Sequence, residues 1–186
     1  MNTRRTPSDH LATSAPSGSA SVRWRRSIAV VLTAGAIVFT FLAASGAGAS
    51  RSNSPLDLSG SDPVTGKPVS LASFRDKPIV LNAWASWCAG CAAEARALDQ
   101  FARSHPQAQV IGIDIQDSKN GAKSFYRRFG WHHPSISDPS GKLAVRLGVQ
   151  GLPTTLFLDR QHRVVAQITG ETNLDGFNKG YTRSTK

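Results

Sequence analysis

Both cysteines of this chain lie in the segment Trp87-Cys88-Ala89-Gly90-Cys91, where an apolar run gives way to a helical pattern. Two thiols separated by two residues close a small disulfide ring only if the backbone turns helical between them. A helix that begins at Cys88 directs free N–H groups and the positive end of its dipole at that sulfur, which favours the thiolate. The spacing therefore predicts a strand that runs into a helix at Cys88, with a dithiol at the junction.

Three kinds of chemistry fit this pair: disulfide exchange, a structural disulfide, or half of a zinc site. A zinc site needs two further ligands at matching spacing, but the chain has no second cysteine pair and its five histidines form no H-x3-5-H pattern. The pattern favours disulfide exchange and leaves the other two as alternatives. We expect no metal and no cofactor other than the redox-active disulfide.

The N-terminal part of the chain predicts export. Residues 1–26 are rich in Ser, Thr, Pro, Ala and Arg without an apolar period, which is typical of disorder. Residues 27–44 carry no charge and reach the lower limit for a membrane-spanning helix. Because Arg25 and Arg26 directly precede this run, the positive-inside rule places everything after it outside the cytoplasm.

We expect the apolar run to remain as a single-pass anchor in the cell membrane, since it is longer than a usual signal-peptide core. The alternative is cleavage after Ala49, in the small-residue segment Ala47-Gly48-Ala49, which would release a secreted protein. The formal net charge of +10 is not gathered into a basic stripe interleaved with aromatic residues, so nucleic-acid binding is not expected.

After a linker over residues 45–55, residues 56–186 are expected to fold as one domain. Apolar runs and helical spacing predict its elements. They are a hairpin over 56–58 and 68–71, strands over 78–85 and 110–115 with a helix over 88–104 between them, helices over 120–129 and 142–147, strands over 154–158 and 164–168, and a weak helix within 174–186. The first strand, helix and strand form a parallel unit, and the last two strands form an antiparallel hairpin.

This order, with the cysteine pair at the first strand–helix junction, resembles the thioredoxin arrangement. Residues 81–94 (Leu-Asn-Ala-Trp-Ala-Ser-Trp-Cys-Ala-Gly-Cys-Ala-Ala-Glu) and 148–159 (Gly-Val-Gln-Gly-Leu-Pro-Thr-Thr-Leu-Phe-Leu-Asp) are similar to segments of the TlpA/ResA-like, DsbE or redoxin-type proteins. The resemblance covers about residues 56–170. It implies an α/β thioredoxin fold, a central mixed β-sheet flanked by helices, with an N-terminal hairpin extension.

The same resemblance implies an exported or membrane-tethered thiol–disulfide oxidoreductase. Many members of the family reduce apocytochrome c before haem attachment. The expected partners are therefore protein substrates with disulfides, with apocytochrome c as a candidate, and a membrane disulfide reductase as the electron donor.

Cys88 is expected to be the attacking thiolate, and Cys91, one helical turn further on, the buried resolving thiol. The resemblance implies that Pro153 follows a cis peptide bond and that the neighbouring backbone pairs with the substrate; an ordinary trans proline is the alternative. Leu152 has no side-chain hydrogen bond to offer and would act through its bulk and its backbone.

Glu94 lies three residues after Cys91 and shares a helix face with it. The resemblance places an acidic residue here that moves protons at the thiols, and an exposed helix glutamate is the alternative. Classical thioredoxins keep a buried aspartate six residues before the first cysteine, whereas this chain has Asn82, which does not titrate. That replacement favours Glu94 or water as the proton acceptor for the resolving thiol.

Other polar and aromatic residues receive simpler interpretations. We expect Trp87 to pack over the thiols and border the substrate, and Trp84 to fill the core. We interpret His132 and His133 as loop residues, and Asp114 and Asp117 as surface or capping groups at a strand end.

The sequence leaves the direction of electron flow open. A reductase is the first hypothesis and an oxidase that donates its disulfide is the second, because the potential depends on how far the thiolate is stabilised. A Sco-like copper-binding protein uses a Cys-x3-Cys spacing, which this chain lacks. A peroxiredoxin-type peroxidase needs Thr-x-x-Cys, and here Ala85 stands at the Thr position.

Overall fold

The computed structural model describes residues 54–186. The predicted disordered segment (1–26), the predicted membrane helix (27–44) and the linker up to residue 53 lie outside the described residues. Within residues 54–186, no helix is both long and apolar enough to cross a bilayer.

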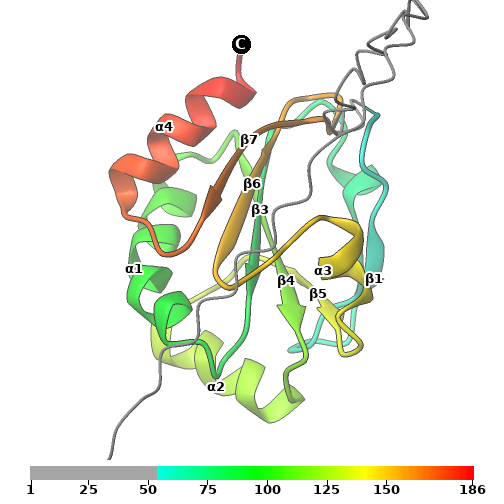
Figure 1. The fold of residues 1–186 in the computed structure, drawn as a ribbon, viewed down its shortest axis with the longest axis vertical. Helices are drawn as coiled ribbons and strands as arrows, with labels where there is room; N and C mark the ends of the chain where they lie inside the picture. The colour runs from blue at the N-terminus through cyan, green and yellow to red at the C-terminus, as the bar shows by residue number, and fades with distance from the viewer. Residues whose placement is uncertain (1–53) are drawn as a thin grey trace, which may run out of the picture. The chain divides into compact units, whose positions relative to one another are not determined.

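A five-stranded mixed sheet forms the centre of this part, in the order β5-β4-β3-β6-β7 (Figure 1). Its strands are β3 (Ile79–Trp84), β4 (Gln109–Ile115), β5 (Ser135–Asp138), β6 (Thr154–Leu158) and β7 (Val164–Thr169). β3, β4 and β5 run parallel, while β6 is antiparallel to both β3 and β7. The predicted parallel unit and the later hairpin are both confirmed.

Helices and a small hairpin cover the sheet (Figure 1). They are β1 (Ser59–Ser61), β2 (Pro68–Ser70), the 3-10 turn η1 (Leu71–Phe74), α1 (Ala89–Ser104), α2 (Lys119–Phe129), α3 (Lys142–Arg146) and α4 (Leu174–Ser184). The terminal helix that we expected to be weak is present, and it buries Phe177 and Tyr181. The described part of the chain therefore has the expected α/β fold, with helices flanking a central mixed sheet.

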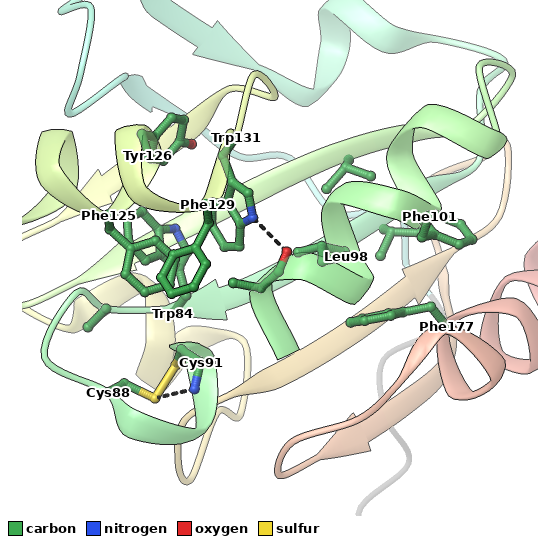
Figure 2. Close-up of a cluster of buried hydrophobic side chains, with 14 of the residues drawn as sticks. Trp84, Cys88, Cys91, Leu98, Phe101, Phe125, Tyr126, Phe129, Trp131 and Phe177 are labelled. Atoms are coloured by element: carbon green, nitrogen blue, oxygen red, sulfur yellow. Dashed lines mark hydrogen bonds between the residues drawn. A yellow bond between two sulfur atoms is a disulfide. The ribbon is translucent and has the colours of Figure 1, made fainter. Parts of the chain in front are cut away.

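Alternation along β3 divides the core into two clusters. All six residues of β3 are buried, and successive side chains point to opposite faces of the sheet. Val80 and Trp84 belong to a cluster rich in aromatic rings, to which α1, α2 and α4 contribute. Leu81 and Ala83 belong to an aliphatic cluster, to which α3 and the segment around the β1–β2 hairpin contribute. Figure 2 shows the aromatic cluster, with the cysteine pair at one end of it.

Two elements differ from the sequence prediction. The sequence did not indicate β5, whose four residues include one apolar side chain, Ile136, yet it pairs with β4 and is largely buried. The first strand of the opening hairpin begins at Ser59 rather than at residue 56, and Leu58 before it is buried in the aliphatic cluster.

The interpretation of Asp114 as a surface or capping group is wrong. Asp114 lies within β4 with only 2% of its surface exposed, because this strand is covered on both faces. His133 lies in the loop that we expected, but it is buried and its ring packs against Trp131.

Candidate active site

The two cysteines form a disulfide at the start of α1, with their Cα atoms 5.2 Å apart. Cys88 is the N-cap of this helix, and its Sγ accepts a hydrogen bond from the amide of Cys91 at 3.1 Å (Figure 2). Cys88 is 7% exposed and Cys91 1% exposed. Cys88 is therefore the more exposed of the two residues, and its sulfur is the one that receives the helix-terminal N–H.

A groove of about 570 Å³ opens beside Cys88. Two exposed apolar side chains border it: Trp87, which is 61% exposed, and Val145 of α3, which is 79% exposed. The Trp87 indole is held in place because its Nε1 donates to the carbonyl oxygen of Gln116 at 3.2 Å. The groove is lined by Trp87, Cys88, Ala89, Gly90, Ile115, Gln116, Ser140, Gly141, Ala144, Val145, Val149, Gln150, Gly151 and Leu152. No charged side chain is among these residues.

The Leu152–Pro153 peptide bond is cis, as expected. The proline ring packs against the turn between the cysteines, because a Cβ added at Gly90 would lie 3.1 Å from Pro153 Cδ. The Pro153 carbonyl accepts a hydrogen bond from Gly170 N at 2.9 Å. Within residues 54–186, the N–H and C=O of Leu152 make no backbone hydrogen bond.

Glu94 is buried, with 2% of its surface exposed. Its Oε1 accepts from Asn82 Nδ2 and its Oε2 from Thr172 N, both at 2.9 Å. Burial raises the Glu94 pKa to about 7; the two hydrogen bonds oppose that rise and the charge of Glu171 adds to it. The alternative of an exposed helix glutamate is therefore wrong, and this carboxyl group exchanges a proton near neutral pH.

Asn82 occupies the position that suggested a missing buried acid. Its Nδ2 donates to Glu94 and also to Thr155 Oγ1 at 3.0 Å across the β3–β6 pair. Asn82 therefore holds the Glu94 carboxyl group inside the core, although it cannot itself take up a proton.

The structure gathers most of the predicted site residues around one opening. Trp87, Cys88 and Leu152 line the groove, and Pro153 packs at the turn between the cysteines. Glu94 is not part of the groove lining and lies on the buried side of α1. Within residues 54–186, no group of three or more His, Cys, Asp or Glu side chains could hold a metal ion.

The sequence reasoning missed how the loop before the cysteines is held. Asp117, interpreted only as a surface or capping group, accepts hydrogen bonds from Ser86 N and Ser86 Oγ as well as from Ser118 N. One signal was available: Gly121 stands inside a predicted helix, and a glycine at such a position often has a packing reason.

The chain resembles known proteins over the whole of this region. Residues 52–181 match the Redoxin family. The thiol-disulfide oxidoreductase ResA of Bacillus anthracis is 29% identical over 122 residues, which cover 63% of this chain and 70% of that protein. The thiol:disulfide interchange protein DsbE of Yersinia pestis is 34% identical over 110 residues, covering 58% of this chain and 57% of that protein. A DsbF homologue from Corynebacterium diphtheriae, whose crystal structure is known, has 36% sequence identity with this chain and superposes with a TM-score of 0.64. The match covers 69% of this chain and 85% of that one.

Proposed function

Because this chain belongs to the Redoxin family and is a thiol–disulfide oxidoreductase of the ResA and DsbE type, we propose that it reduces protein disulfides outside the cytoplasm. The observation that carries the proposal is the position of Cys88, whose sulfur receives the Cys91 amide beside an uncharged groove. The apolar run over residues 27–44 supports a membrane anchor. The resemblance of residues 81–94 and 148–159 to TlpA/ResA-like segments supports a role in cytochrome c maturation.

The reaction requires two successive exchanges. The Cys88 thiolate attacks one sulfur of the substrate disulfide; a bond forms between them, and the other substrate sulfur leaves as a thiolate that takes up a proton. Cys91 then loses its proton and attacks Cys88, which closes the enzyme disulfide and releases the second substrate thiol. Two electrons pass from the enzyme dithiol to the substrate, and a membrane disulfide reductase restores the dithiol.

Glu94 is the proton acceptor for Cys91 in this scheme. The two residues lie on adjacent turns of α1, and Glu94 has a pKa of about 7 because it is buried. A base with a pKa close to the working pH is efficient, since about half of it is unprotonated and this form still binds a proton readily. Asn82 supports this role by orienting the carboxyl group.

Leu152 and Pro153 hold the substrate chain. An extended segment that pairs with the unoccupied N–H and C=O of Leu152 would lie next to the Cys88 sulfur and enter the groove bordered by Trp87. The groove carries no charge, so it accepts residues beside the substrate cysteine without an electrostatic requirement.

A disulfide-donating oxidase is the second candidate, and one observation favours it. The Cys91 amide points at Cys88 Sγ, and stabilising the thiolate of the reduced form makes a dithiol pair more oxidising. Equilibration with glutathione separates the two directions. A potential near that of thioredoxin, about −270 mV, supports the reductase, and one near about −120 mV supports the oxidase.

A trapping experiment tests the proposal. Replacing Cys91 with Ser leaves Cys88 able to attack but removes the thiol that resolves the mixed disulfide. Expressed in the native host, Cys91→Ser is expected to retain exported proteins through Cys88, with apocytochrome c among them. The double variant Cys88→Ser/Cys91→Ser is the matched control and should retain nothing. If the single variant also retains nothing and its thiol does not react with alkylating agents, disulfide exchange is excluded.

A further inference from the structure

The turn that carries Cys88 is held by residues that follow β4. Ser86 N donates to Asp117 Oδ2 at 2.5 Å, and Ser86 Oγ donates to Asp117 Oδ1 at 2.8 Å. Trp87 Nε1 donates to the Gln116 carbonyl at 3.2 Å. Three hydrogen bonds therefore connect the two residues directly before Cys88 to the loop between β4 and α2.

Two residues near the contact between Ser86 and Asp117 have locally unfavourable conformational properties. Gly121 lies in the first turn of α2, where alanine would be the better helix former. A Cβ at this position would lie 2.3 Å from Ser86 Oγ and 2.7 Å from Asp117 Oδ1. Gln116 has a φ of 49°, in the left-handed region that residues other than glycine rarely adopt. The absence of a side chain at Gly121 leaves the space in which Ser86 and Asp117 meet.

A buried acid, Asp114, lies near the same carboxylate. Burial raises the Asp114 pKa to about 7, and the charge of Asp117 raises it further. Asp117 also accepts a hydrogen bond from Ser118 N at 2.6 Å. The Asp117 carboxylate is thus oriented by several donors, two of which belong to Ser86.

We propose that Asp117 is a positioning residue for Cys88: it fixes Ser86 and so keeps the Cys88 sulfur against the amide of Cys91. The proposal rests on the proposed function, in which Cys88 attacks as a thiolate. Ser86, which contacts Asp117, is only two residues before Cys88. The two residues lie in the same turn, in which Cys88 N donates to Ala85 O at 3.2 Å. A shift of Ser86 therefore moves the sulfur away from the helix end that stabilises its negative charge.

The sign of the effect separates positioning from simple charge. A nearby carboxylate disfavours a thiolate, so if only the charge of Asp117 mattered, its removal would lower the Cys88 pKa. If Asp117 positions the sulfur, its removal raises the Cys88 pKa. A residue that only stabilises the fold changes the melting temperature and leaves the thiol pKa unchanged.

The experiment measures the thiolate absorbance of Cys88 against pH in reduced protein with Cys91→Ser, where Cys88 is the only thiol. We expect Asp117→Ala to raise the Cys88 pKa by about one unit, which slows its reaction with iodoacetamide about tenfold below both pKa values. Ser86→Ala removes one hydrogen bond without changing any charge and is expected to slow the reaction about threefold. Asp175→Ala removes an exposed acid of α4 and serves as the control, with no change expected.

Gly121→Ala adds a second test that does not depend on the stability of Asp117→Ala. The new methyl group displaces Ser86 and Asp117 without removing a charge or a hydrogen-bonding group, so we expect a raised Cys88 pKa at a temperature where the variant is folded. An unchanged or lowered Cys88 pKa in the folded Ser86→Ala and Gly121→Ala variants overturns the proposal. The thiol pKa does not involve a substrate: an enzyme that reduces no protein disulfide but shows these shifts contradicts the proposed function and leaves the positioning role intact.

Discussion

The two faces of the central sheet are built differently. One face packs aromatic side chains, two of which are oriented by hydrogen bonds: Trp84 Nε1 donates to Ser135 Oγ at 3.1 Å. Trp131 Nε1 donates to Ala95 O at 2.9 Å (Figure 2). The other face is made of Leu, Ile, Val and Ala side chains, which carry no hydrogen-bonding groups. Cys88 and Cys91 belong to the aromatic cluster.

The difference between the two faces suggests a division of roles: the aromatic face carries the reactive groups, and the aliphatic face contributes stability. Asn82 extends from the same face of β3 as Val80 and Trp84, and it meets Glu94 there. The cysteine pair and the Glu94 carboxyl group, to which we assign electron and proton exchange, therefore lie on the aromatic face. The aliphatic face contributes burial, which depends on area and has no direction.

The largest effect is expected from Cys88→Ser, which removes the reactive atom of the aromatic face. We expect disulfide reduction to fall by at least about a thousandfold, because no other thiol in the chain is placed to attack. The measurement is the rate of reduction of a model protein disulfide. The melting temperature should match that of the reduced wild type. Substantial residual activity would show that Cys91 attacks substrates directly.

Ile113→Ala probes the opposite face. Ile113 is fully buried in the aliphatic cluster, so we expect the free energy of unfolding to fall by about 3 to 4 kcal/mol. Urea denaturation measures this change. At a temperature where the variant is folded, the alkylation rate of Cys88 should equal that of the wild type. A slower rate would mean that the two faces do not act separately.

Glu94→Gln tests the proton-exchanging group of the aromatic face. In the folded protein the Glu94 pKa is raised from 4.5 to about 7, so between these values the folded state holds a proton that the unfolded state has lost. The free energy of unfolding therefore falls as pH rises through this window, with a contribution from Glu94 of about 3 kcal/mol. In the oxidised protein, Glu94→Gln should remove that contribution when urea denaturation is compared at pH 4.5 and pH 8. An equal pH dependence in variant and wild type would show that Glu94 is not buried as a carboxyl group.

Trp131→Phe is expected to have the smallest effect. It keeps most of the aromatic packing but deprives the Ala95 carbonyl of its hydrogen bond, which costs about 1 kcal/mol of unfolding free energy. Trp87→Phe is the matched control, because Trp87 is exposed and lies outside the aromatic cluster, and it should cost less. If both substitutions cost the same, the paired polar atoms do not distinguish the aromatic face.

The sequence predicted the elements that carry their own signal. The apolar runs that became β3 and β4, and the helical spacing of α1, are long enough to be assigned without tertiary information. β5 was missed because only Ile136 among its residues is apolar. Its burial arises from a distant segment, since Asp62 Oδ2 accepts a hydrogen bond from Ser135 N at 2.9 Å.

The same distinction applies to the site. Cys88, Cys91 and Pro153 were found from local spacing and from the resemblance. The environment of Glu94 was left open because helix spacing gives the face of a residue and not its depth; its burial depends on Thr172, which is distant in the sequence. The contact between Asp117 and Ser86 joins two loops and had no local pattern except Gly121.

The opening hairpin also determines how copies of this domain can associate. The N–H of Ser135 already donates a hydrogen bond to Asp62. Gly60 lies so close to Ile136 that a Cβ added at Gly60 would lie 2.6 Å from Ile136 Cγ2. A strand from another molecule cannot pair along β5 without displacing the hairpin, and paired or covered edges resist aggregation. Within residues 54–186, β7 is the other outer strand of the sheet, and Val165 is exposed on it. In the folded domain, the covered edge at β5 leaves β7 as the edge at which a further strand would add.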